Sequence, residues 1–199
     1  MTEFNTIQSP SIAEFKDRGS KFIAYAFPVQ SIEEFKQKLN DIKKEHPKAT
    51  HHCFAYRLGT DGNNFRVSDD GEPSGSAGRP ILGQIDSRQL TNTLIVVVRY
   101  FGGSLLGVPG LINAYKTASS LSLQLTPVIS KSIEALYNLE FPYMLLDQVL
   151  KTARQAGATV VKKDIQLFCT LIISIPVKGV GTLPEQFELL EGVTLSRIT

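Results

Sequence analysis

Hydrophobic positions over residues 1–128 alternate between the period of a strand and the period of a helix. The pattern predicts strands at Ser20–Val29, His52–Leu58 and Thr93–Arg99, with helices after Ser31, at Arg79–Ile85 and up to about Leu125. Ser31 and Glu34 have the spacing of a capping box, which marks the start of the first helix. The unbroken apolar run inside Thr93–Arg99 indicates a strand covered on both faces. This order of elements predicts a layered domain of the α/β or α+β class over residues 1–128.

A second domain is predicted over residues 130–199, because Pro127 ends the helical pattern before it. Strands are expected at Ser132–Phe141, Thr159–Lys163, Gln166–Pro176 and Val193–Ile198, and helices at Tyr143–Gln155 and about Leu183–Leu190. This β-α-β-β-α-β order is that of a ferredoxin-like domain.

Charge and composition narrow the classes of function. The chain has 21 Lys and Arg against 19 Asp and Glu, and neither side of Ser130 has a clear basic excess. Proteins held to nucleic acid by many phosphate contacts usually have such an excess, so an anion site would be local. No secretory signal and no bilayer-length apolar run is visible. With Cys53 and Cys169 in separate apolar stretches, we expect a cytoplasmic protein with buried free thiols and no membrane contact.

A glycine-rich segment, Arg99–Gly110, leads from a buried strand into a helix. The free N–H groups at the start of a helix favour an anion, which makes this segment a candidate binding loop. The Walker pattern fails, because Val108 and Pro109 follow Gly107, and the dinucleotide-binding spacing is absent. The alternative is a tight structural turn whose glycines allow close packing of helix and sheet.

A second polar loop, Ser68–Pro80, contains three carboxylates within four residues. These carboxylates are oxygen ligands of the kind that divalent cations prefer, although the calcium-loop pattern is not met. Its hydroxyls and glycines are equally suited to hold a phosphate at the short helix that follows. A solvated loop with local turns is the third interpretation. Loops of this length inside a compact domain are more often functional than idle.

Three adjacent residues, His51, His52 and Cys53, begin a predicted strand. Neighbours on a strand face opposite sides, so the two histidines are poorly placed to share a metal or a proton with Cys53. We therefore favour a structural role or a ligand contact over nucleophilic catalysis. Upstream, Lys21 and Arg18 flank Gly19 and would reach an anion, although a basic turn is the commoner interpretation.

Together these segments resemble the IMPACT/YigZ family. The residues that carry the resemblance are Gly19–Phe22, His51–Cys53, Ala55–Arg57, Ser68–Gly78, Arg99–Gly103, Leu106–Gly107, Gly110–Leu111 and Ala114–Tyr115. The resemblance covers most of residues 16–120 and is interrupted where Pro109 replaces a usual glycine and Asn113 a frequent Arg or Lys.

The resemblance implies an amino-terminal domain like the second domain of ribosomal protein S5. The carboxy-terminal domain would be like the last domain of elongation factor G. Eukaryotic relatives regulate translation by keeping the amino-acid-starvation kinase from its activator, and bacterial relatives are proposed to bind nucleic acid or ribosomes.

The leading hypothesis is a translation-related binding protein, rather than an enzyme, that contacts RNA, the ribosome or a translation factor through the two loops. No cofactor and no metal are expected. The predicted ligand-binding residues are Lys21, His52, Arg57, Asp69, Asp70, Glu72, Ser74, Ser76, Arg99, Tyr100, Gly102, Gly103, Gly107 and Gly110. One alternative is a hydrolase-like, metal-dependent enzyme acting on a phosphorylated or peptide-like small molecule. Another is a protein-interaction module that uses residues 130–199.

Overall fold

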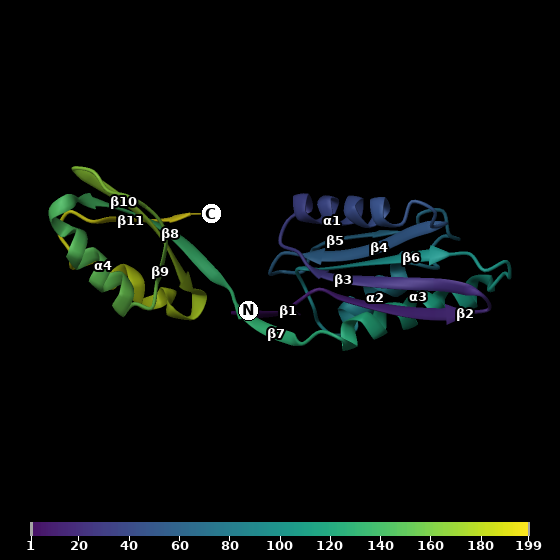
Figure 1. Ribbon diagram of the computed structural model, residues 1–199. Coiled ribbons are helices and arrows are strands. Elements are labelled where there is room, and N and C mark those ends of the chain that lie inside the picture. The colour runs from purple at the N-terminus through teal and green to yellow at the C-terminus, as the bar shows by residue number, and fades with distance from the viewer. Residues whose placement is uncertain (1, 199) are drawn as a thin grey trace. The chain divides into compact units, whose positions relative to one another are not determined.

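The computed structural model describes residues 2–198 as two compact units (Figure 1). The larger unit is Phe4–Lys131, and the smaller one takes in residues 132–198 together with residues 2 and 3. Residues 2 and 3 group with the smaller unit because the Ile133 N–H donates to the Thr2 carbonyl at 2.9 Å. The chain therefore passes from one unit to the other within strands β1 (Glu3–Ile7) and β7 (Val128–Ser132), which pair with each other.

The larger unit is built on a five-stranded sheet with the order β2-β3-β6-β4-β5. Its strands are β2 (Ser11–Asp17), β3 (Ser20–Pro28), β4 (His51–Leu58), β5 (Asn64–Ser68) and β6 (Thr93–Tyr100). Helix α1 (Ile32–Glu45) covers one face, and α2 (Gly78–Ser87) and α3 (Gly107–Gln124) cover the other (Figure 1).

All neighbouring strands of this sheet are antiparallel. The class is therefore α+β, and the α/β alternative is wrong. Alternation of strands and helices suggested α/β, but β2–β3 and β4–β5 are hairpins, which place neighbouring strands in opposite directions. The β2–β3 hairpin turns at Arg18 and Gly19, which both have positive φ angles.

The sheet separates two hydrophobic cores. One lies between the sheet and α2 and α3, and includes Phe22, Ile95 and Tyr115. The other lies between the sheet and α1, and includes Phe35 and Val96. Residues 93–98 of β6 are buried throughout, which confirms the prediction of a strand covered on both faces.

The smaller unit has the β-α-β-β-α-β order that the sequence predicted. Its elements are β8 (Glu134–Pro142), a 3-10 turn (Tyr143–Leu145), α4 (Leu146–Gln155), β9 (Thr159–Asp164), β10 (Phe168–Pro176), a 3-10 segment (Val177–Thr182), α5 (Leu183–Glu188) and β11 (Thr194–Ile198). The antiparallel sheet has the order β11-β8-β10-β9. Alternate residues of β8 and β10, with Val149 and Ala153 of α4, form its core.

Strands β1, β2, β5 and β7 were missed by the sequence analysis. In β2, Ile12 is exposed and Ser11 is buried, the reverse of what their polarity suggests. The strand exists because its backbone pairs with β3 along its whole length. Both cysteines are free and buried, as expected. Among the residues described, no helix is long and apolar enough to cross a membrane.

The capping box of α1 is formed in a modified way. The Ser31 side chain accepts a hydrogen bond from the Glu34 N–H at 3.2 Å. The Glu34 carboxylate in turn accepts from the N–H of Gln30, one residue before the cap, at 2.7 Å. Two backbone donors are thus satisfied at the helix start.

We expect Ser31→Ala to lower the free energy of unfolding by about 1 kcal/mol, because a helix N-terminal donor loses its partner. Urea denaturation followed by circular dichroism measures this change. Ser87→Ala is the control, since Ser87 is exposed and bonds only to the Gln84 carbonyl within its helix. It should cost less than about 0.5 kcal/mol. Equal losses in the two variants would contradict the capping role.

Candidate functional site

The two polar loops meet at a buried ion pair. Glu72 of the first loop accepts a hydrogen bond from Nη1 of Arg99 at 2.7 Å. The side chains of Arg99 and Glu72 are only 6% and 3% exposed. Tyr115 of α3 donates its hydroxyl to the same Glu72 oxygen, also at 2.7 Å. The loop after β5, the end of β6 and helix α3 are therefore joined at one carboxylate.

Cys53 and His51 lie on the same side of the sheet as this carboxylate. The Cys53 thiol is 3.3 Å from the Tyr115 hydroxyl and 3.0 Å from the Asp69 carbonyl. Burial raises the pKa of Cys53, and burial together with Cys53 raises the pKa of Tyr115. Both groups are therefore protonated at neutral pH, and Cys53 is a poor nucleophile, because the thiolate is the reactive form.

The two histidines face opposite sides of the sheet, as their positions on a strand predicted. His51 bonds the Asp70 carbonyl at 2.8 Å and lies 3.8 Å from Glu72. His52 turns toward α1, where its Nε2 is 3.1 Å from the His46 carbonyl. Burial lowers the pKa of His52, so this histidine is neutral at pH 7.

Asp69 organises the first loop from inside. Its carboxylate accepts the N–H groups of Gly75, Ala77 and Gly78 at 2.8, 3.0 and 2.8 Å. Burial alone would raise the pKa of Asp69, but these three donors outweigh burial and hold the pKa below its usual value. Because Ala77 and Gly78 begin α2, Asp69 satisfies the donors of this helix start, which lacks a cap from the Ala77 side chain.

Asp70 is held as well. It has a positive φ angle of 42°, and its carboxylate accepts a hydrogen bond from the backbone N–H of His52 at 2.7 Å. The same carboxylate lies 3.8 Å from the His52 ring. Among the side chains that the structure describes, no group of three or more His, Cys, Asp and Glu is placed to hold a metal ion.

In the second loop, Gly102 lies directly against the β2–β3 turn. A Cβ atom on Gly102 would fall 1.9 Å from the carbonyl carbon of Gly19 and 2.2 Å from the nitrogen of Ser20. The Gly102 N–H donates to Ser20 Oγ at 3.2 Å, and Nη2 of Arg99 reaches the same oxygen at 3.4 Å. Gly102 is therefore needed for the close approach of two backbones, which supports the structural interpretation at this position.

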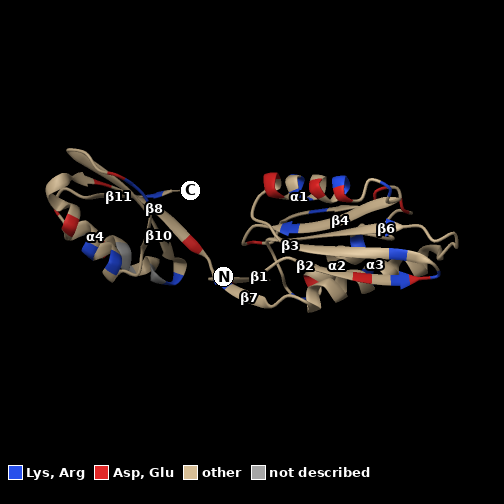
Figure 2. Cartoon of the chain, in the orientation of Figure 1, with Lys and Arg blue, Asp and Glu red and all other residues tan. Residues whose placement is uncertain are grey.

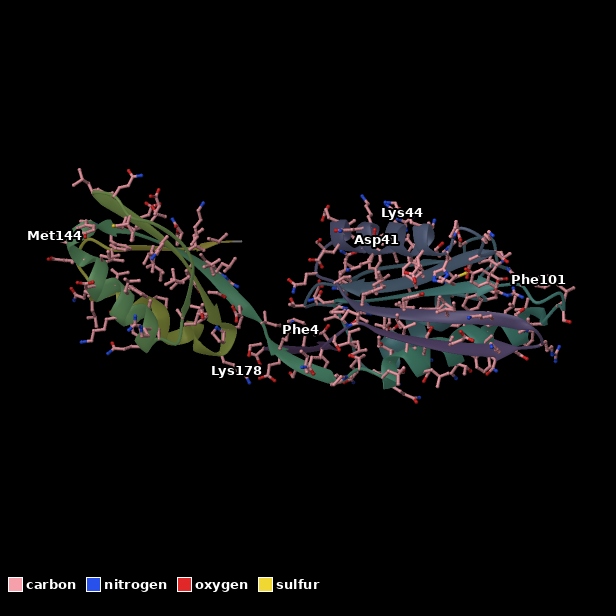
Figure 3. The ribbon with its side chains drawn as sticks, in the orientation of Figure 1. Phe4, Asp41, Lys44, Phe101, Met144 and Lys178 are labelled. Carbon is pink, nitrogen blue, oxygen red and sulfur yellow. The ribbon has the colours of Figure 1, made fainter. Side chains whose placement is uncertain are left out.

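The outer surface of the second loop is mainly apolar. Phe101 is 47% exposed and Leu105 is 85% exposed, and Val108 and Ile112 of α3 are exposed beside them. The Arg99 guanidinium lies 5.5 Å from the centroid of the Phe101 ring. Phe101 projects from the end of the larger unit (Figure 3). We call Phe101, Leu105, Val108 and Ile112 the loop tip.

Several predicted residues lie away from Glu72. Lys21 pairs with Glu14 at 2.6 Å, and Tyr100 bonds to His46 at 2.8 Å on the α1 side. Arg57 pairs with Asp86 at 2.8 Å. It is six residues along β4 from His51, or roughly 20 Å. The structure therefore does not bring these two cations and this tyrosine to the meeting point of the loops.

The other predicted residues are parts of the loops themselves. Ser74 is exposed, whereas Ser76 is buried and donates to the Pro73 carbonyl at 2.6 Å. Gly103 and Gly107 are exposed and have positive φ angles, and Gly110 packs against Leu106 inside α3. Tyr115 and Phe101 are not among the site residues predicted from the sequence. Tyr115 could have been chosen because it lies on the inward face of the predicted helix. Phe101 could have been chosen because it directly precedes Gly102 and Gly103.

Comparisons with known proteins agree on one family. The family model for the Impact N-terminal domain matches residues 18–123. An IMPACT family member from Haemophilus influenzae is 34% identical over 188 residues, which cover 94% of this chain and 91% of the relative. IMPACT family member YigZ from Escherichia coli is 33% identical over 164 residues, which cover 81% and 80%.

Two solved structures are also similar. The crystal structure of a hypothetical protein is 29% identical, has a TM-score of 0.80 and is matched over 98% of its length and 100% of this chain. The structure of the two-domain translational regulator Yih1 is 28% identical, with a TM-score of 0.37 over 61% of this chain and 47% of Yih1.

We expect Gly102→Ala to destabilise the protein by about 2 kcal/mol, because the new methyl group forces the loop and the β2–β3 turn apart. Chemical denaturation measures the loss. The control is Gly83→Ala in α2, where a Cβ meets nothing within 4 Å. Alanine suits a helix better than glycine, so this variant should gain about 0.5–1 kcal/mol. A neutral Gly102→Ala would show that the close approach is unnecessary.

The lowered pKa of Asp69 predicts a pH dependence of stability. An aspartate has a pKa of about 3.9 in the unfolded chain. Because its folded value is lower, Asp69 stabilises the fold above about pH 4, and this contribution disappears as pH falls through the folded value. Asp69→Asn should therefore lose less stability than the wild type between about pH 5 and pH 2.

Thermal unfolding across that pH series is the measurement. Asp61→Asn is the control, since Asp61 is exposed and bonds only to Asn63 in its own turn. The Asp69 interpretation fails when Asp69→Asn and the wild type lose stability in parallel as the pH falls.

Proposed function

This chain belongs to the IMPACT family, and from that premise we propose that it is a translation-related protein that binds RNA or a ribosomal component without catalysis. The binding surface is the loop tip together with the adjacent β2–β3 turn. Family membership motivates the link to translation, and the exposed Phe101 ring on a fixed base is the observation that carries the binding role.

The site is built as a platform. Below the surface, the Glu72, Arg99 and Tyr115 side chains are buried, and Arg99 and Tyr115 both donate to Glu72, so the root of the loop is fixed. Above them, Phe101 presents a half-exposed aromatic ring, which packs on the buried Arg99 guanidinium 5.5 Å from the ring centroid. Single-stranded RNA is commonly recognised by stacking of its bases on exposed aromatic rings and Arg planes.

Electrostatic attraction supplies a small part of this binding. Arg18, in the turn beside Gly102, is exposed and is suited to contact a phosphate. Acidic and basic residues alternate elsewhere, for example along α1 (Figure 2). Because few phosphates are contacted, the affinity for RNA should decrease only slightly as the salt concentration rises.

The two units also fit a role in translation. We assign the larger unit to the type of the second domain of ribosomal protein S5, as the family resemblance implies. We assign the smaller unit to the ferredoxin-like type found as the last domain of elongation factor G. The support for this second assignment is its β-α-β-β-α-β order and its sheet order β11-β8-β10-β9.

The geometry favours binding over the enzyme alternative. A nucleophile needs an adjacent base or a lowered pKa. The pKa of Cys53 is raised instead, and Asp69 and Glu72 already accept hydrogen bonds from within the protein. These groups are arranged to hold the loops in place.

Phe101→Ala should weaken binding to a single-stranded RNA about tenfold, because one stacking surface is removed. Filter binding across about 50–200 mM salt measures the affinity and its salt dependence. The matched control is Phe65→Ala on β5. Phe65 is 53% exposed and also lies beside an arginine, Arg57, at 5.0 Å, but outside the loop tip.

The control should bind RNA like the wild type. The proposal is wrong when the wild-type protein neither retains RNA at low salt nor sediments with ribosomes. Equal losses in the two phenylalanine variants would contradict the choice of surface.

A further inference from the structure

A second surface lies in the smaller unit, apart from the two loops. It is a groove of about 320 Å³ between helix α4 and strand β9. Its apolar lining consists of Leu146, Leu150, Val160, Val161, Ile165 and Leu171. All these residues belong to the smaller unit, so the groove is complete within it.

Strand β9 forms an open edge beside this groove. It is the last strand in the order β11-β8-β10-β9, and every residue of β9 is exposed. Among residues 2–198, no strand pairs with its outer side. An open edge presents backbone N–H and C=O groups that another polypeptide strand can pair with.

The charged residues in the lining are both positive. Lys162 and Lys163 project from opposite faces of β9, and among the described residues neither takes part in an ion pair. Lys151 and Arg154 of α4 add two further cations on the neighbouring element, against Asp147 of α4 and Asp164 of β9. The two elements that border the groove therefore carry four cations and two anions.

We propose that this groove binds an extended, acidic segment of a partner protein, which adds a strand to the edge of β9. Apolar side chains of the segment enter between β9 and α4, on the face that carries Lys163, while the carboxylates that alternate with them pair with Lys162 on the opposite face of the strand. This site is independent of the proposed RNA surface, because it uses different residues in the other unit.

The chemistry selects this occupant over others. A second copy of the chain pairing β9 with β9 would bring two lysine pairs toward each other, which is unfavourable for facing strands. A lipid surface or an RNA would meet the lysines, but neither supplies the peptide groups that an open strand edge can pair with. An acidic polypeptide satisfies the apolar lining, the lysines and the edge together.

The exposed surface continues past the groove. Leu167, in the turn between β9 and β10, is 90% exposed, and Met144 before α4 is 85% exposed. The Tyr143 N–H donates to the Leu167 carbonyl at 3.0 Å, so these two segments adjoin. Met144 projects from the smaller unit near the start of α4 (Figure 3). A bound segment would have room to extend its apolar contacts in this direction.

The test uses the full chain and a short fluorescein-labelled peptide in which valine and glutamate alternate. Fluorescence anisotropy should show binding at least about tenfold tighter than that of a matched valine–lysine peptide. The double variant Lys162→Glu/Lys163→Glu should reverse this preference. A circular dichroism spectrum like that of the wild type shows that the variant is folded. The matched control is Lys43→Glu/Lys44→Glu, an exposed lysine pair on α1, which should keep the wild-type preference.

Hydrogen exchange distinguishes strand addition from other modes of binding. With the valine–glutamate peptide bound, amides of β9 should exchange more slowly, while those of the opposite edge strand β11 should not change. The proposal is overturned by equal affinity for the two peptides or by protection elsewhere but not in β9. It is also overturned by dimerisation that depends on Lys162 and Lys163, or by binding of these lysines to anionic vesicles or RNA but not to the peptide.

Discussion

The buried pair of Glu72 and Arg99 is the interaction on which the arrangement of both loops depends. Two charges removed from water are tolerated when each has a close partner and further hydrogen bonds. Here Tyr115 supplies the second bond to Glu72, and Ser20 lies within reach of Arg99. Because these four residues come from the first loop, β6, α3 and β3, a small network of hydrogen bonds joins these segments where β6 ends and β3 begins.

Like this contact, several polar residues in the loops hold the structure together. Asp69 binds the start of α2 and Asp70 binds the backbone of β4, so both carboxylates already accept hydrogen bonds from within the protein. Asp70 and Ser74 of the first loop are exposed, and the second loop presents an aromatic and aliphatic tip around Phe101. Such a surface is suited to stacking and apolar contact more than to holding a phosphate or a cation. Gly102 has a structural role too, because its lack of a side chain lets the second loop lie against the β2–β3 turn.

The two units present surfaces of different chemistry. The larger unit exposes an aromatic loop on a fixed base, and the smaller unit exposes an open strand edge beside an apolar groove with lysines. The first surface suits bases and the second suits a peptide backbone. Taken together, the two proposed surfaces would connect an RNA or ribosomal component with a protein partner.

Local patterns in the sequence determined the start of α1, the buried strand β6 and the β-α-β-β-α-β order, because these depend on neighbouring residues. The opposite orientations of His51 and His52 also followed from strand geometry alone. Tertiary structure decided the antiparallel sheet and the edge strands β2 and β5, which depend on distant backbone partners. It alone brought Glu72 to Arg99 and Gly102 to Gly19. These contacts join residues far apart in the chain, so no local pattern encodes them.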